Sequence, residues 1–213
     1  MGAADNHPAA AETADWTITQ DDALLIVDVQ NDFLPGGALA VPDGDAVIRP
    51  LNRYISMFLS RLRPVLATRD WHPEGHSSFT TRGGQWPPHC LAATPGAAFA
   101  EGLELPDRAT IISKATRQEQ DAYSGFGGTN LAAILREFGV RRLFVGGLAT
   151  DYCVLNTVRD ALTEDFAVCL LADAVRAVNL KPTDGDAALA EMESLGAVLV
   201  RLPEAHIAGA TSR

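Results

Sequence analysis

Short apolar runs alternate with amphipathic segments along most of this chain, and this alternation constrains its fold more than any other feature. The runs are continuously apolar, as is typical of strands that are covered on both faces of a parallel sheet. Six strands are expected, at residues 23–29, 64–70, 109–114, 141–147, 166–173 and 197–202. The pattern therefore predicts an α/β fold with a mainly parallel sheet and helices on both of its faces.

Four helices are expected between these strands, at residues 43–63, about 128–139, 151–164 and 183–195. In the first helix the apolar residues fall on one stripe, and Asp43 is available as its N-cap. The last helix follows Pro182 and ends at Gly196, the usual start and stop residues. Open parallel sheets bind ligands at the carboxyl ends of their strands, so we expect the functional site at that edge.

The length of 213 residues suits one α/β domain with an ample core. Residues 1–20 are rich in alanine and polar residues without periodicity, which predicts a flexible N-terminal extension before a single domain at 21–213. The formal net charge of −10 argues against a nucleic-acid or anionic-membrane partner and favours a small-molecule substrate. The sequence leaves the oligomeric state open, a homo-oligomer included.

The N-terminus has no basic segment followed by an apolar core, and no later run is long enough to span a bilayer. A cytoplasmic location is therefore expected. The three cysteines, at 90, 153 and 169, have no paired short spacing, which indicates reduced thiols rather than disulfides. Cys169 lies in an apolar run, as a small core residue would.

Cys153 lies just inside a strand-to-helix junction, because helical spacing begins after Thr150. Free N–H groups and the helix dipole stabilise an anion at such a place, so we expect a thiolate with a depressed pKa. Alone, this cysteine fits a core residue equally well. Other strand ends carry polar residues, Asp28, Asp70 and Lys114, which should converge on the same edge. An acid, a lysine and a thiol together provide a nucleophile, its proton acceptor and a cation for the thiolate.

Residues 71–108 show little periodicity, and long irregular segments in compact domains are usually functional. This segment contributes His72, His76 and His89, and it follows directly after Asp70. A carboxylate with two imidazoles suits a divalent transition metal that keeps positions open for water or substrate. His76 is the weakest candidate, because it could instead cap the loop or bind a carboxylate.

Three aromatic residues, Phe33, Trp86 and Tyr123, lie in irregular or strand-end segments rather than on amphipathic stripes. Core packing explains such residues in many proteins. Flat apolar walls also suit the binding of a planar ring by a few polar anchors, so these residues are candidates for a substrate pocket.

Six motifs occur in order between residue 22 and about residue 202: VDVQNDF, TRDWHPEGHSSF, WPPHC, SK, YSGF and GLATDYCV. Together they resemble the nicotinamidase (pyrazinamidase) branch of the isochorismatase-like cysteine hydrolases. The resemblance implies a three-layer αβα sandwich with a six-stranded parallel sheet. It also implies metal-dependent hydrolysis of nicotinamide to nicotinic acid and ammonia in NAD salvage, with pyrazinamide as a further substrate.

The resemblance implies roles for residues at the thiol. The catalytic triad would consist of Asp28, Lys114 and Cys153, with a thioester as the intermediate. The backbone N–H groups of Ala149 and Cys153 would form the oxyanion hole. The peptide bond between Leu148 and Ala149 would be cis.

The same resemblance implies a metal site and a ring-binding pocket. The metal ligands would be Asp70, His72 and His89, with His76 as a possible fourth. Zinc is the expected ion, and the ligand set also admits iron or manganese. The metal would hold the ring nitrogen of the substrate, while Phe33 and Trp86 would enclose the ring.

Other functions remain to be weighed. Amidases of the same fold that act on N-carbamoyl, biuret-like or maleamate-like compounds would keep the triad but would not need Asp70, His72 and His89 as ligands. True isochorismatases lack the nucleophilic cysteine. A non-catalytic metal-binding or redox-sensing protein would use Cys153 with Cys90, but it would give the acid and the lysine no role.

Overall fold

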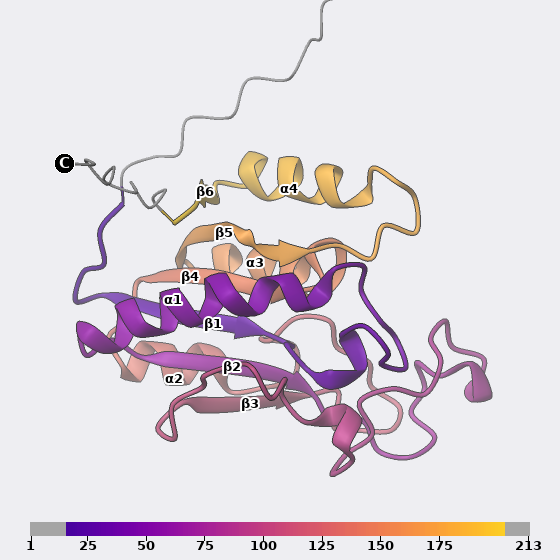
Figure 1. Cartoon of the computed structure of the whole chain (residues 1–213). Coiled ribbons are helices and arrows are strands. Elements are labelled where there is room, and N and C mark those ends of the chain that lie inside the picture. The colour runs from indigo at the N-terminus through magenta and orange to yellow at the C-terminus, as the bar shows by residue number, and fades with distance from the viewer. Residues whose placement is uncertain (1–15, 203–213) are drawn as a thin grey trace, which may run out of the picture.

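The computed structural model describes residues 16–202, which form one six-stranded sheet with the strand order β3-β2-β1-β4-β5-β6. Every neighbouring pair is parallel, and the strands occur where the sequence predicts them (Figure 1). The strands are β1 (Asp22–Val27), β2 (Val65–Asp70), β3 (Thr110–Lys114), β4 (Arg142–Leu148), β5 (Ala167–Arg176) and β6 (Val198–Val200). The predicted α/β class with a parallel sheet is confirmed.

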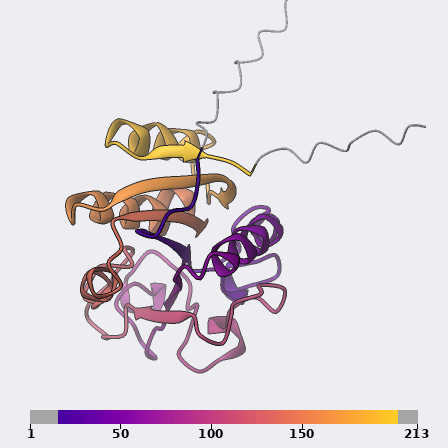
Figure 2. The same ribbon diagram turned by 90° about the vertical axis from the view of Figure 1, so that its left-hand side faces the viewer.

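Helices cover both faces of the sheet, and Figure 2 shows the three layers from the side. They are α1 (Ile48–Ser60), α2 (Leu131–Glu137), α3 (Leu155–Thr163) and α4 (Asp184–Ser194). Alternate residues of β1 point to opposite faces: Leu24 belongs to the core under α1, whereas Leu25 belongs to the core under the other three helices. Both residues are fully buried, as the continuously apolar run predicts.

Two predicted helices start differently from expectation. The segment after Asp43 begins with a 3₁₀ turn at Gly44–Val47 before α1. Asp43 has a left-handed backbone (φ 51°), and its side chain makes no capping hydrogen bond, so the predicted N-cap is wrong. The helix predicted from residue 151 begins with a π-helical turn at Thr150–Val154 and continues as α3.

The first described residues contact the domain. The Trp16 ring lies 5.3 Å from that of Phe144 and 5.8 Å from that of Tyr54, and its Nε1 donates to the Arg201 carbonyl over 3.0 Å. Residues 16–20 of the expected extension are thus in contact with the sheet and α1, and residues 1–15 lie outside the described part. Within residues 16–202, no helix has the length and apolar character needed to cross a membrane.

The irregular segment at 71–108 crosses the carboxyl-end edge of the sheet, on the right in Figure 1. Its helical content is limited to 3₁₀ turns at Thr80–Arg82 and Pro95–Ala97. Isolated bridges connect His72 with Leu91 and Phe79 with Trp86, so this segment folds back on itself beside the strand ends. The fold therefore brings the candidate residues of the loop to the predicted edge.

Candidate active site

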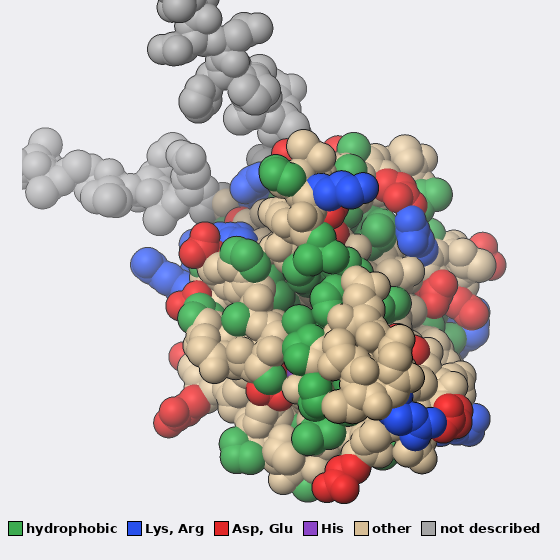
Figure 3. All heavy atoms as spheres, turned by 90° about the vertical axis from the view of Figure 1, so that its right-hand side faces the viewer, with side chains coloured by type: hydrophobic (Ala, Val, Ile, Leu, Met, Phe, Trp, Pro, Cys, Tyr) green, Lys and Arg blue, Asp and Glu red, His purple; other side chains and the backbone are tan. Residues whose placement is uncertain are grey.

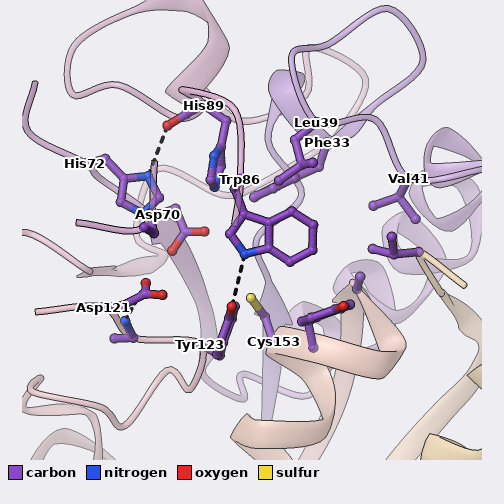
Figure 4. Close-up of a pocket in the computed structure, with 15 residues that line it drawn as sticks. Phe33, Leu39, Val41, Asp70, His72, Trp86, His89, Asp121, Tyr123 and Cys153 are labelled. Atoms are coloured by element: carbon purple, nitrogen blue, oxygen red, sulfur yellow. Dashed lines mark hydrogen bonds between the residues drawn. The ribbon is translucent and has the colours of Figure 1, made fainter. Parts of the chain in front are cut away.

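Cys153 lies in the π-helical turn that directly follows β4, and its side chain faces a pocket at the carboxyl edge of the sheet (Figure 4). Only 6% of the residue is exposed. The Nζ of Lys114 lies 3.5 Å from its Sγ. The predicted convergence of strand four with the other strand ends is present in the structure.

Lys114 ends β3 and is a buried cation between two carboxylates. Its Nζ donates to Oδ1 of Asp70, which stands opposite it in β2, and to the Ala122 carbonyl over 3.1 Å. Oδ2 of Asp28 lies 2.9 Å away. Burial alone would lower the pKa of Lys114, but the two carboxylates raise it well above its ordinary value. The side chain is therefore an ammonium.

Asp28 directly follows β1 and keeps one carboxylate oxygen available for the thiol. Its Oδ1 accepts a 2.7 Å hydrogen bond from the Thr68 hydroxyl, while its buried Oδ2 forms the ion pair with Lys114 and has no further hydrogen-bond donor among the described residues. An oxygen of Asp28, an oxygen of Asp70 and the Cys153 sulfur all lie within 4.8 Å of one another. Burial raises the pKa of Asp28 despite the opposing charge of Lys114, so this carboxylate is a stronger base than an exposed one.

The ionisation of Cys153 differs from expectation. Burial raises the pKa of the thiol well above its ordinary value, and this effect exceeds the opposing effect of Lys114. The carboxylates of Asp28 and Asp70 raise it further. The predicted depressed pKa is therefore wrong, because desolvation and two nearby anions outweigh the lysine. The resting group is a thiol beside a base.

The backbone at the junction matches what the resemblance implies. The peptide bond between Leu148 and Ala149 is cis. Ala149 and Cys153 both line the pocket, and the Ala149 N–H donates no hydrogen bond within residues 16–202. A donor without a protein partner is available to an oxygen atom in the pocket.

Asp70, His72 and His89 form a buried group at the other end of the pocket, with potential ligand atoms within 4.8 Å of one another. Nδ1 of His72 lies 3.0 Å from the His89 carbonyl, and Nδ1 of His89 lies 2.8 Å from the Pro87 carbonyl. Because a carbonyl only accepts, each Nδ1 atom carries a proton, which leaves Nε2 as the potential ligand atom of each ring. Burial, with the adjacent imidazoles, lowers the pKa of His72 to about 3, so it is neutral. This donor set fits a divalent transition metal.

His76 lies against His72, with ring centroids 4.4 Å apart, but both of its nitrogens have protein partners. Nε2 lies 3.2 Å from the Gln120 carbonyl, which requires a proton on Nε2. Nδ1 then accepts from Ser78, whose Oγ is 2.8 Å away. His76, Asp121 and His72 also form a loose potential ligand group, but these hydrogen bonds favour a supporting role for His76.

The three predicted aromatic residues, Phe33, Trp86 and Tyr123, line the pocket. Trp86 Nε1 donates to the Tyr123 hydroxyl over 3.0 Å, and Phe33 packs on His89 with centroids 5.6 Å apart. Figure 3 shows this face of the molecule, where hydrophobic side chains gather near the centre. Sequence reasoning missed seven further lining residues: Leu39, Val41, Ser78, Asp121, Ala122, Tyr152 and Val178.

Tyr152 is the most informative of the missed residues, because its ring stands edge-on to Trp86 at 5.1 Å. It directly precedes Cys153, so its place in the strand-to-helix junction was an available signal. The π-helical turn brings both residues to the pocket, whereas the regular helical spacing expected from residue 151 does not predict this.

The sequence model of the isochorismatase domain matches residues 22–204. The chain belongs to the isochorismatase family. The family expectation from the six motifs is thereby confirmed, and the three-layer sandwich with its parallel sheet agrees with it.

Several members of the isochorismatase family are similar over most of the chain. The nicotinamidase of Escherichia coli (strain K12) is 39% identical over 203 residues, which cover 85% of this chain and 95% of that protein. The pyrazinamidase of Pyrococcus horikoshii, solved in complex with zinc, is 52% identical with a TM-score of 0.82, covering 85% of this chain and 99% of that one. PnC1 from L. infantum, solved with nicotinate, is 40% identical with a TM-score of 0.82, covering 87% and 96%.

Proposed function

We propose that this isochorismatase-family protein is a nicotinamidase, which hydrolyses nicotinamide to nicotinic acid and ammonia in NAD salvage. One observation carries the proposal: the Cys153 thiol, which is backed by the buried Asp28–Lys114 ion pair, lines the same pocket as the carboxylate and two imidazoles of Asp70, His72 and His89. The similarity to the nicotinamidase and pyrazinamidase described above supports it. Pyrazinamide, which has a similar planar ring and carboxamide, is a second proposed substrate.

The reaction begins with the thiol and its neighbours. Oδ2 of Asp28 accepts the Cys153 proton, while the Lys114 ammonium stabilises the thiolate. The thiolate then attacks the amide carbon and forms a tetrahedral intermediate. Because the resting group is a thiol with a raised pKa, proton transfer to Asp28 accompanies the attack.

The N–H groups of Ala149 and Cys153 bind the oxyanion of this intermediate, and each such donor contributes about 3 kcal/mol in comparable acyl transfers. Asp28 returns the proton to the nitrogen, the C–N bond breaks and ammonia leaves, so that a thioester remains on Cys153. A water molecule, which gives its proton to Asp28, then attacks the thioester. Nicotinic acid is released, and the proton returns to the thiol.

The other end of the pocket orients the ring. Asp70, His72 and His89 would hold one divalent metal ion, with zinc as the proposed ion and iron or manganese as alternatives. A bound metal ion supplies a Lewis-acid position for the ring nitrogen. Phe33 and Trp86 give flat apolar walls, and the hydroxyl of Tyr123 fixes the edge of the Trp86 ring. This arrangement restricts the carboxamide to the vicinity of the thiol.

We also propose a cellular location and a domain extent for the enzyme. All three cysteines are free and buried, which supports a reducing compartment and a cytoplasmic location. A single hydrolase domain at residues 21–213 is proposed to be sufficient for activity, with residues 1–20 as an extension.

Ammonia release from nicotinamide, with nicotinic acid identified by chromatography, tests the proposal. The purified protein should release both products in equal amounts when zinc, iron or manganese is supplied. Asp165→Asn removes a charge on the connection between α3 and β5. This control substitution should retain full activity. If the protein releases no ammonia with zinc, with iron and with manganese alike, the proposed function is overturned.

A further inference from the structure

The VDVQNDF motif contains three consecutive polar residues that the proposed reaction does not use. Gln30 is fully buried, and its side-chain amide contacts the backbone of Asp70 on both sides. Oε1 accepts from the Asp70 N–H over 2.8 Å, while Nε2 donates to the Asp70 carbonyl over 2.8 Å and to the Ala97 carbonyl over 2.9 Å. This pair of bonds fixes the peptide groups that flank the Asp70 side chain.

Asp32 makes the corresponding contact with the segment that carries His89. Its Oδ2 accepts a 2.7 Å hydrogen bond from the N–H of Cys90, the residue directly after His89. Cys90 has a positive φ of 46°, and its carbonyl accepts from the His72 N–H over 3.0 Å. Asp32 therefore holds Cys90, which directly follows His89 in the chain and accepts a hydrogen bond from the His72 backbone.

The packing around Asp32 leaves its carboxylate little freedom. A Cβ atom on Gly96 would lie 2.2 Å from Oδ2, so this glycine allows the backbone to approach the carboxylate closely. Oδ1 accepts from the Ala38 N–H over 3.3 Å, at the start of the loop that bears Leu39. The carboxylate thus connects the segment of His89 with a wall of the pocket.

We propose that Gln30 and Asp32 are positioning residues of the metal centre, through which the end of β1 sets the geometry of Asp70 and His89. The inference rests on the proposed function, because it concerns the same ligand group. Neither side chain touches the reacting atoms. Groups that orient metal ligands typically change metal affinity by about 10-fold to 100-fold when they are removed, so the role is measurable as affinity.

Asp32→Ala is the decisive variant, and Asn31→Ala is its matched control. Asn31 donates from Nδ2 to the Pro95 carbonyl over 2.8 Å, so the control removes a bond between neighbouring loops without touching Cys90. Zinc affinity is measured by competition with a chromophoric chelator, and the Co²⁺-substituted proteins are compared by visible absorption. We expect zinc affinity to fall about 10-fold to 100-fold in Asp32→Ala, with an altered Co²⁺ spectrum, and to stay within about 2-fold in the control.

Two further variants separate positioning from folding. Asp32→Asn keeps one oxygen for the Cys90 N–H and should recover most of the zinc affinity. Gln30→Glu keeps Oε1 but loses both N–H donors to Asp70 and Ala97, and it should weaken zinc binding relative to the Asn31→Ala control. Melting curves identify any variant that does not fold. If Gln30→Glu does not fold, the zinc affinities of Asp32→Ala and Asp32→Asn alone decide the inference.

The inference is overturned if Asp32→Ala binds zinc as tightly as the unaltered protein, even when its melting temperature falls. It is also overturned if Asn31→Ala loses as much affinity, since the effect would then belong to loop packing. A failure of the proposed function looks different: the unaltered protein would bind zinc with the expected order among variants but release no ammonia from nicotinamide.

Discussion

The two ends of the pocket are built by different means. At the thiol end, Asp28, Lys114 and Cys153 come from the ends of parallel strands or from the turn that follows one, and Lys114 contacts both the Asp28 carboxylate and the thiol. At the metal end, His72 and His89 lie on an irregular segment, and backbone carbonyls orient their rings. The sheet thus places one end by topology, and hydrogen bonds within a loop place the other.

Asp70 joins the two ends. It is the last residue of β2, and its Oδ1 accepts from the Lys114 ammonium. No described residue donates a hydrogen bond to its other carboxylate oxygen, so that oxygen is free to bind a metal. Charge lost at the thiol end should therefore affect stability strongly, whereas changes at the metal end should mainly affect the orientation of substrate.

The largest expected effect is on catalysis at the thiol. Cys153→Ala should lower the rate of ammonia release on the order of 10⁴-fold to 10⁶-fold, because no other group can form the thioester. Its unfolding free energy should fall only slightly, since the substitution removes a single buried sulfur atom. Steady-state kinetics and urea denaturation check both statements, and a variant that keeps a tenth of the activity would contradict the triad.

Lys114→Met should give the largest loss of stability. The substitution leaves the carboxylates of Asp28 and Asp70 buried without their cation, which typically costs about 3–5 kcal/mol. Arg82→Met is the control, because Arg82 and Glu119 form an exposed pair that should contribute less than about 1 kcal/mol. Equal unfolding free energies for the two variants would show that the buried network is not a structural element.

Metal removal should affect substrate binding more than the thiol chemistry. Treatment with a chelator should raise KM for nicotinamide by about 10-fold or more, as expected for the loss of a positioning interaction, and added zinc should restore it. The melting temperature should also fall, because a ligand of the folded state is removed. A fall in kcat at unchanged KM would contradict the division between the two ends.

The smallest expected effect concerns the pocket wall. Trp86→Phe keeps an aromatic ring but loses the hydrogen bond to the Tyr123 hydroxyl, which is worth about 1 kcal/mol. KM should therefore rise about 5-fold with little change in kcat. Tyr123→Phe removes the same bond from its other partner and should give a similar value, whereas a much larger effect in only one variant would indicate a direct contact of that residue with substrate.

The sequence predicted which residues meet at the thiol end, for a physical reason. Parallel strands end at one edge of a sheet, so continuously apolar runs were enough to bring Asp28, Lys114 and Cys153 together. The strand register then places Asp70 directly opposite Lys114, a contact that the sequence pattern did not reveal. The ionisation of Cys153 was mispredicted because burial and neighbouring carboxylates, rather than the helix terminus, dominate its pKa.

Local patterns could not reveal features that depend on distant hydrogen bonds. The protein partners of His76 and the contact of Asp32 with Cys90 join residues of different loops, and the bond of Gln30 to Asp70 spans two strands. The 3₁₀ turn before α1 removed the expected role of Asp43 as an N-cap. The residue types predicted a metal-binding loop, whereas the order imposed on that loop comes from tertiary contacts.

The most direct test of the division between the two ends is calorimetric binding to the Cys153→Ala protein, which cannot turn over its ligand. Nicotinamide and benzamide, which lacks the ring nitrogen, are titrated into the zinc-loaded and the zinc-free protein. The account predicts that zinc strengthens the binding of nicotinamide at least about 10-fold and leaves benzamide unchanged. Equal effects of zinc on both ligands, or none on nicotinamide, would contradict it.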